Sequence, residues 1–253
     1  MNEKILKVVF VLTVIAVGLY FTYPELSEAQ KISYAKSYGI TLILTSGGIV
    51  IGIALGFMLA FLKFLNNKFL SFIIDEYVDI IRGTPIVIQL MVFVFIIFAT
   101  WSNNIAAAIF ALGLNSSAYV AEIVRSGINS VDRGQMEAAR AMGLGYGTAM
   151  KEIVFPQAIK NILPALANEF ISLFKETSVV GLVAITDLTF FSKSMQAALY
   201  TVQPILFAAV LYYASVKFFS FLVKMLEMVK RSLLKLLRNQ LKEENLKGKL
   251  LRF

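Results

Sequence analysis

Residues 40–64 read ITLILTSGGIVIGIALGFMLAFLKF, and no charged residue occurs in this stretch before Lys63. A transmembrane helix needs about 20 consecutive, mostly apolar residues, so the stretch is predicted to cross a bilayer. Five further runs have a similar character: 5–23, 85–101, 105–127, 158–180 and 203–224. The sequence therefore predicts an all-α, polytopic membrane protein with six spans. Five is the alternative, because residues 5–23 also have the form of a cleaved signal peptide.

The composition agrees with a chain that lies largely in lipid. Hydrophobic residues make up 58% of the 253 residues, and the mean hydropathy is +0.75, whereas soluble domains are roughly 45 to 50% apolar. The chain contains no Cys and no His. Disulfides, Cys/His metal sites and an imidazole base are therefore excluded. We expect no catalytic residue and no metal site, so the protein is predicted not to be an enzyme.

The basic residues predict how the chain is oriented. The net charge is +8, and residues 224–253 alone hold nine Lys and Arg against three Glu. A basic stretch after a hydrophobic span is typical of a cytoplasmic flank rather than of a nucleic-acid site. With alternating loops, nineteen of the 24 Lys and Arg fall inside and three outside. We therefore expect a multi-pass protein of the bacterial cell membrane, with a cytoplasmic C-terminus and a basic tail at 229–253.

Residues 128–156 then form a large cytoplasmic loop between the fourth and fifth spans. Asp132 with Gln135 has the spacing of a capping box, and Gly143 is predicted to close the first helix in the left-handed conformation. A second short helix is expected at 148–155. The loop is either a solvated linker or a surface that contacts another protein. Residues 65–84 are predicted to be a short surface helix on the same side.

Four stretches resemble one family of transport proteins. The order Glu137-Ala138-Ala139, three residues, Gly143, nine residues, Ile153, one residue, Phe155-Pro156 resembles the EAA loop of membrane subunits of type I ABC importers, with Phe155 where the family has leucine. Three others resemble the polar amino-acid permease branch: Arg82-Gly83-Thr84-Pro85 with Gln89, residues 118–127, and Lys175-Glu176-Thr177-Ser178. The likeness covers about residues 38–228. An N-terminal transmembrane helix with an outer linker at 1–37 and the tail lie outside it.

The resemblance implies a type I ABC importer transmembrane fold with five core helices and an extra N-terminal helix. It implies a permease subunit of an ATP-driven amino-acid importer, whose coupling loop docks on a separate ATP-binding subunit through Glu137, Ala138, Ala139 and Gly143. It also implies a second permease copy or paralogue and an extracytoplasmic solute-binding protein. No Gly-x-x-x-x-Gly-Lys-Ser/Thr loop occurs in the chain. ATP and Mg are therefore expected on the partner, and no cofactor is expected here.

Polar residues inside the predicted spans are candidates for the translocation pathway. Lipid-facing charges cost about 2.5 to 3.5 kcal/mol each at the bilayer centre, so such residues are expected to face protein or water. The candidates are Gln89, Asn115, Ser117, Glu122, Asn168, Glu169, Ser172 and Lys175. The alternative is structural, with interhelical hydrogen bonds and an ion pair of Lys175 with Glu176 or Glu122. The carboxylates favour a basic amino acid as substrate.

Two further alternatives stay open from the residues alone. The row Gly48, Gly52 and Gly56 can form a dimer seam or pack a helix within one subunit. The chain can also be an ion-coupled secondary amino-acid carrier that uses Glu122, Glu169 and Lys175 as a relay, although no inverted repeat is evident.

Overall fold

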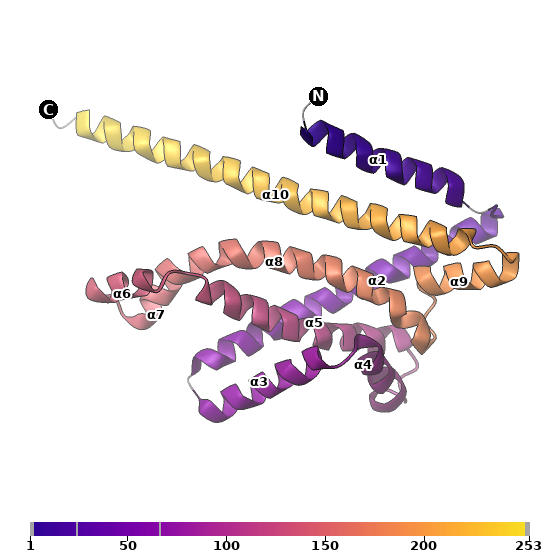
Figure 1. The fold of residues 1–253 in the computed structure, drawn as a ribbon. Helices are drawn as coiled ribbons and strands as arrows, with labels where there is room; N and C mark the ends of the chain where they lie inside the picture. Colours follow the sequence, from indigo (N-terminus) through magenta and orange to yellow (C-terminus); the bar gives the residue numbers. More distant parts are fainter. Residues whose placement is uncertain (1–2, 24, 66, 251–253) are drawn as a thin grey trace. The chain divides into compact units, whose positions relative to one another are not determined.

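The computed structural model describes residues 3–23, 25–65 and 67–250, and every regular element in these ranges is helical (Figure 1). The chain divides into two compact units, Met1–Tyr213 and Ala214–Phe253. The first unit contains all elements up to the start of α10, and the second consists of the rest of that helix. The α-helices are α1 (Glu3–Thr22), α2 (Glu28–Leu62), α3 (Lys68–Gly83), α4 (Ile86–Val92), α5 (Asn104–Asn129), α6 (Arg133–Ala141), α7 (Tyr146–Ala149), α8 (Phe155–Glu176), α9 (Leu188–Leu199) and α10 (Gln203–Leu250).

Three of the described helices are long and apolar enough to cross a membrane: Glu28–Leu62, Asn104–Asn129 and Gln203–Leu226. A fourth span results if the bent pair Lys68–Gly83 and Ile86–Ile97 counts as one. This criterion of length and composition, applied to the described residues alone, counts fewer helices than the six predicted spans. The described apolar part of α1 is the shorter helix Leu6–Thr22. α8 has 22 residues, and it carries the pathway candidates Asn168, Ser172 and Lys175, which we call the polar row of α8.

The helix α2 begins well before the apolar stretch that marked it in the sequence. Ser27 accepts a hydrogen bond from the Gln30 amide, and the Gln30 side chain accepts one from the Ser27 amide, which completes a capping box. This cap starts the helix at Glu28. The outer linker predicted to extend to residue 37 is therefore mostly helix.

The pair α2 and α5 forms the centre of the first unit. A Cβ atom added to Gly52 would lie 2.7 Å from Cβ of Ser116, and one added to Gly56 would lie 2.5 Å from Cβ of Val120. Real Cβ atoms do not approach this closely, so the two backbones meet where the side chains are missing. Of the two alternatives for this glycine row, the structure supports packing within one subunit.

The predicted helix at 65–84 is α3, whereas the predicted span at 85–101 is too long, because helical backbone covers only Ile86–Ile97. The chain forms α3, then α4 with a π-helical turn at Phe93–Ile97, and the two arms are bent by 107°. α3 packs against α5 with its buried residues Ile74, Val78 and Ile81. Its polar residues suggested a surface helix, but its apolar face is covered by α5.

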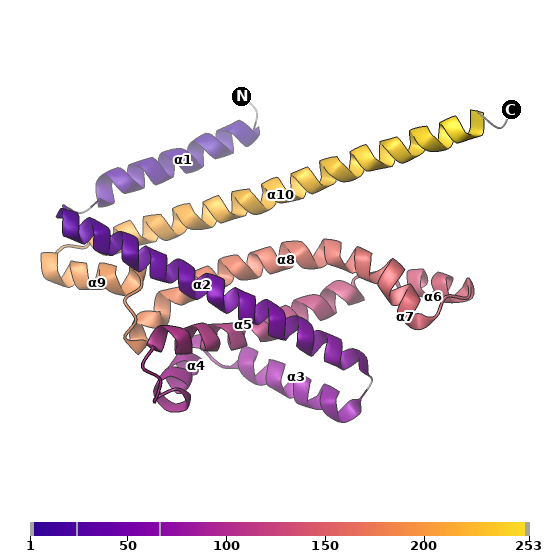
Figure 2. The same cartoon turned by 180° about the vertical axis from the view of Figure 1, so that it is seen from behind.

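The loop that contains α6 and α7 lies at one end of the first unit. In both views, α6 and α7 lie at one end, and α4 and α9 lie at the other (Figures 1 and 2). α8 connects these ends and packs against α5. A 3₁₀ segment at Thr177–Val183 leads from it to α9, a helix that the apolar runs did not predict.

Candidate coupling hairpin and polar pathway

The first helix of the hairpin at residues 130–149 starts and ends where its sequence predicts, but the Gln135 side chain contacts Gln157 rather than completing the predicted capping box with Asp132. The Asp132 side chain caps α6 by accepting a hydrogen bond from the Gly134 amide at 2.7 Å. Gly143 has φ +87°, the left-handed conformation that favours glycine. Its amide donates to the Arg140 carbonyl, and the Leu144 amide donates to the Ala139 carbonyl. These two bonds are those of a Schellman motif, so the chain reverses tightly after α6.

One face of α6 is anchored, and the other is free for contact. Ala139 is buried. Met136 packs against a cluster that joins residues of α5 and α8. In contrast, Glu137, Ala138 and Gly143 are exposed. Of the four predicted coupling residues, three are therefore accessible on the surface, while Ala139 holds the hairpin to the helices behind it.

The predicted second helix of the loop is not a separate element. Helical backbone runs from Tyr146 through the π-helical turn Met150–Val154 into α8, where Pro156 lies in the first turn as expected. α5 persists to Asn129, so the non-helical part of the predicted loop is shorter than 128–156. The hairpin and α8 therefore share one continuous helical backbone.

Gln89 and Asn115, two of the pathway candidates, contact each other inside the first unit. The Asn115 amide donates to Oε1 of Gln89 at 2.9 Å. The Gln89 amide donates to the Ile81 carbonyl at 2.6 Å and to both the carbonyl and the hydroxyl of Thr84. These acceptors belong to the end of α3, where Pro85 offers no amide hydrogen. Gln89 therefore caps the break between α3 and α4.

Two further buried contacts join α5 to its neighbours. The Ser116 hydroxyl donates to Oε1 of Glu169 in α8 at 2.7 Å. Ser117 shares a hydrogen bond of 2.7 Å with the Tyr77 hydroxyl of α3. The predicted pathway candidates include Glu169 and Ser117, but they include neither Ser116, a polar residue of the same span, nor Tyr77. Tyr77 lies in the stretch taken for a surface helix, and no local signal marks its partner.

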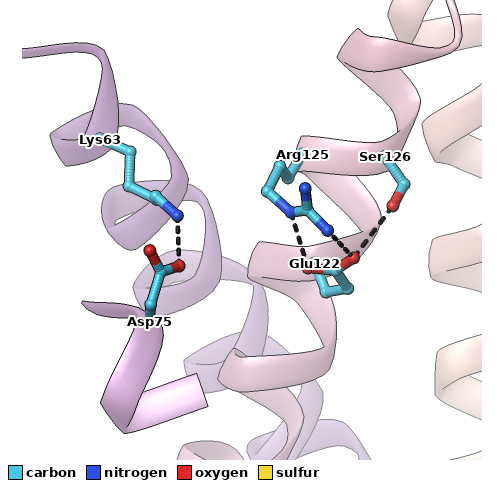
Figure 3. Close-up of polar contacts among 5 residues, drawn as sticks. All are labelled: Lys63, Asp75, Glu122, Arg125 and Ser126. Atoms are coloured by element: carbon cyan, nitrogen blue, oxygen red, sulfur yellow. Dashed lines mark hydrogen bonds and ion pairs between the residues drawn. The ribbon is translucent and has the colours of Figure 1, made fainter. Parts of the chain in front are cut away.

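Glu122 lies apart from these contacts. It accepts a hydrogen bond from Nε of Arg125 at 2.8 Å and another from the Ser126 hydroxyl at 3.2 Å, as Figure 3 shows. Glu122 is therefore paired within one turn of α5 and not with Lys175.

The remaining candidates lie along α8. Asn168 and Lys175 are exposed, and Ser172 is half-buried. Within the described ranges no ion pair joins Lys175 to Glu176 or to Glu122. The structure brings together Gln89 with Asn115, Glu169 with α5, and Ser117 with α3. It leaves Asn168, Ser172 and Lys175 of α8 without a covering helix among those described. No group of three acidic side chains in the described part of the chain is arranged to hold a metal ion.

Together these features define a helical, multi-pass membrane protein with a short helical hairpin between α5 and α8 and no nucleotide-binding loop in its sequence. Residues 48–230 match the family described as binding-protein-dependent transport system inner membrane component. The chain belongs to this family. It is thus a membrane-spanning permease subunit of an ABC-type transport system, in which ATP hydrolysis belongs to a separate subunit, and the ion-coupled carrier is not favoured.

Curated relatives and solved structures agree with this assignment. The arginine transport system permease protein ArtQ of Bacillus subtilis is 39% identical over 196 residues, which cover 76% of this chain and 90% of the relative. A putative glutamine transport system permease protein GlnP of Rickettsia conorii is 38% identical over 193 residues, covering 74% and 88%. A crystal structure of an amino acid ABC transporter with histidines is 35% identical with a TM-score of 0.74, covering 81% and 99%. The MetNI methionine ABC transporter, at 21% identity, shares the fold with a TM-score of 0.70, covering 79% and 97%.

Proposed function

We propose that this chain is one of two permease subunits that form an amino-acid pathway through a bacterial cell membrane. A separate subunit, which binds ATP and Mg, binds the hairpin at 130–149 and drives transport through it. An extracytoplasmic solute-binding protein delivers the amino acid. The observation that carries this proposal is the division of the hairpin into a buried anchor at Ala139 and an exposed surface with Glu137 and Ala138 of α6 and Gly143 of the following turn.

The exposed face of α6 suits a protein partner. Met142 and Tyr146, which flank Gly143, are 73% and 54% exposed. Apolar side chains that lie uncovered on a polar hairpin are typical of an interaction surface. Small residues at Ala138 and Gly143 let a partner approach closely. The continuous helical backbone into α8 then carries the movement of the partner into the membrane helices.

The uncovered row of α8 supports the second permease subunit. Asn168, Ser172 and Lys175 would be unfavourable against lipid, because polar and charged side chains in a membrane normally face protein or water. A second permease copy or paralogue facing this row, with water between, satisfies these groups. The row then forms one wall of the pathway.

The relatives named for arginine and for glutamine support an amino acid as substrate. An amino acid presents a carboxylate and an ammonium group, which need opposed polar partners. Glu169 lies one residue beside the exposed row and is fixed by Ser116. Its carboxylate favours a basic amino acid.

The orientation follows from the hairpin. An ATP-binding subunit lies in the cytoplasm, so the hairpin is cytoplasmic and α8 leads outward from it. α10 then returns inward and places the C-terminus in the cytoplasm, in agreement with the basic residues after 224.

The test is whether a soluble ATPase stays with the permease through this hairpin. Ala138→Trp adds a bulky side chain at an exposed position of α6, and we expect the ATPase to be lost during purification in mild detergent. The matched variant Ala198→Trp changes an exposed alanine of α9, at the opposite end of the first unit, and should retain the ATPase. Equal retention in both variants, or ion-driven uptake by the isolated chain in liposomes, would contradict the proposal.

A further inference from the structure

A small pocket lies between the C-terminal end of α2, the middle of α3 and the C-terminal half of α5. Its volume is about 130 Å³. α5 ends at Asn129, directly before the hairpin, so the pocket opens on the hairpin side of the first unit. Its apolar walls are formed by Ala60, Ile74, Val78, Ala121 and Ile128.

Four charged side chains line this pocket, two of each sign. Lys63 forms an ion pair with Asp75 of α3, and Arg125 pairs with Glu122 within α5 (Figure 3). Their side chains keep between 26% and 57% of their surface exposed. The four charges sum to zero, and both cations and both anions remain accessible from the pocket.

This arrangement matches a ligand that carries both charges. A carboxylate can replace Glu122 or Asp75 on the Arg125 guanidinium or the Lys63 ammonium, and charge-assisted bonds of this kind are the stronger ones. The ligand's ammonium group then forms an ion pair with the displaced carboxylate of Glu122 or Asp75. A ligand with one charge would leave an ion of the pocket without its partner, which costs most for Lys63 and Glu122, the two least exposed of the four side chains. The pocket therefore selects a small zwitterion.

We propose that this pocket binds the amino and carboxylate groups of a free α-amino acid on the hairpin side, apart from the polar row of α8. The choice of an amino acid rests on the proposed function, because the transported solute accumulates on this side of the membrane. The small volume admits the shared backbone groups of amino acids rather than one particular side chain.

The pocket shares its wall with the support of the hairpin. Ala60 and Ile128 belong to the same apolar cluster as Val154 of the π-helical turn, and Met136 and Met150 pack against that cluster. A ligand shifts a conformational equilibrium by its difference in affinity for the two states. An amino acid in this pocket therefore lies against the cluster that supports the hairpin, and it shifts the hairpin only if it binds one hairpin position more tightly than another.

The test uses the full-length chain, purified with its ATPase subunit, in nanodiscs of phosphatidylglycerol without binding protein. L-glutamine is titrated by calorimetry, because its neutral side chain isolates the two backbone charges. Its controls are N-acetyl-L-glutamine and L-glutaminamide, which each lack one charge. We expect binding of L-glutamine alone, and a Kd raised about tenfold in Arg125→Gln or Lys63→Gln, since one charged hydrogen bond is lost.

Two further variants keep the test decisive. Asn129→Trp fills the pocket's exposed rim without removing a charge, and it should weaken binding even if the charge variants fold poorly. Lys31→Gln breaks the exposed ion pair of Lys31 with Glu28 at the start of α2 and should leave the Kd unchanged. ATP-driven uptake by the wild-type complex in proteoliposomes, with a solute-binding protein added, tests the proposed function separately.

Three results would overturn the inference. The first is no binding to the wild type, or the same Kd in the wild type, Arg125→Gln and Asn129→Trp, which would place the amino acid elsewhere. The second is equal binding of the two singly charged controls. The third is loss of L-glutamine binding when phosphatidylethanolamine is added to the nanodiscs, which would assign the pocket to that lipid's ammonium and phosphate groups.

Discussion

The side-chain amide of Asn115 in α5 donates to Oε1 of Gln89 in α4 at 2.9 Å, and both side chains are buried. Through this contact the central helix of the first unit holds the residue that caps the break between α3 and α4. The bend between α3 and α4 thus depends on Asn115, a side chain of α5 that is far from the bend in the sequence.

Replacing Gln89 by Leu should destabilise the protein. The Ile81 carbonyl, the Thr84 carbonyl and the Asn115 amide would each lose a partner. A buried polar group without a partner costs about 1 to 3 kcal/mol. We expect a clearly lower Tm in detergent. Adding Asn115→Leu should cost less than that change costs alone, because the two side chains share one bond, and simple additivity would contradict this account.

The contact of α2 with α5 gives a second prediction. Gly56→Ala places a methyl group 2.5 Å from Cβ of Val120 and 2.8 Å from the Ser117 carbonyl oxygen. The helices must separate, so Tm should fall by several degrees. Gly39→Ala is the matched control in the same helix, because nothing lies within 4 Å of its added Cβ. That change should be neutral or stabilising by about 0.5 to 1 kcal/mol. A similar Tm for both variants would show that the close approach is not required.

The sequence predicts some parts of this fold because their signals are local. The apolar run at 40–64 marks α2, and Gly143 marks the end of α6, since one residue's conformational freedom decides that turn. The path of α3 has no such signal. Its polar residues read as a surface helix, whereas its position depends on Tyr77 meeting Ser117, 40 residues later in the chain.

The candidate pathway shows the same division. Its residues could be chosen from the sequence because polar groups are rare in apolar spans. Their partners could not, because Gln89 with Asn115 and Glu169 with Ser116 are contacts between helices. Amphipathic periodicity gives the face of a helix, but it does not give the helix that the face meets.

Gly143→Val should uncouple ATP hydrolysis from uptake. A β-branched residue at φ +87° is strained by about 1 to 2 kcal/mol, so the turn after α6 must change and the exposed face with it. The chain should still insert. Gly147→Val is the control in the same hairpin, because its backbone is helical and no atom lies within 4 Å of an added Cβ. ATPase activity and uptake are measured with the complex in proteoliposomes, and unaltered coupling in Gly143→Val would refute the role of this turn.

Glu169→Gln should lower the uptake of a positively charged amino acid more than that of a neutral one. The amide keeps an oxygen that can accept from the Ser116 hydroxyl, so the contact of α8 with α5 is preserved, while the negative charge is lost. On the proposed function, uptake of arginine should fall about tenfold, the effect of losing roughly 1.4 kcal/mol, and uptake of glutamine should change little. The comparison is made at equal protein amounts in proteoliposomes. An equal loss for both amino acids would indicate a structural role for Glu169.

Asp187 gives a prediction of pH dependence outside the spanning helices. Its carboxylate caps α9 by accepting from the amides of Thr189 and Phe190, and the Tyr212 hydroxyl donates to it at 3.4 Å. Burial nevertheless raises the pKa of Asp187 above its ordinary value of 3.8, while the hydrogen bonds oppose that shift. The folded state therefore holds the proton more tightly than the unfolded state does. The protonated Asp187 carboxyl therefore stabilises the fold fully below pH 3.8, and this stabilisation decreases as pH rises through the folded-state pKa.

Asp187→Asn should remove this component of the pH dependence. Asparagine caps helices about as well as aspartate, and it has no proton to lose. The Tm of the wild type in detergent should fall relative to that of the variant as pH is raised from about 4, because only the wild type must bury a charge. The difference in Tm at each pH isolates Asp187 from the other titrating groups. A difference that stays constant from pH 4 to 7, or that changes with the opposite sign, would show that the hydrogen bonds at the start of α9 outweigh burial.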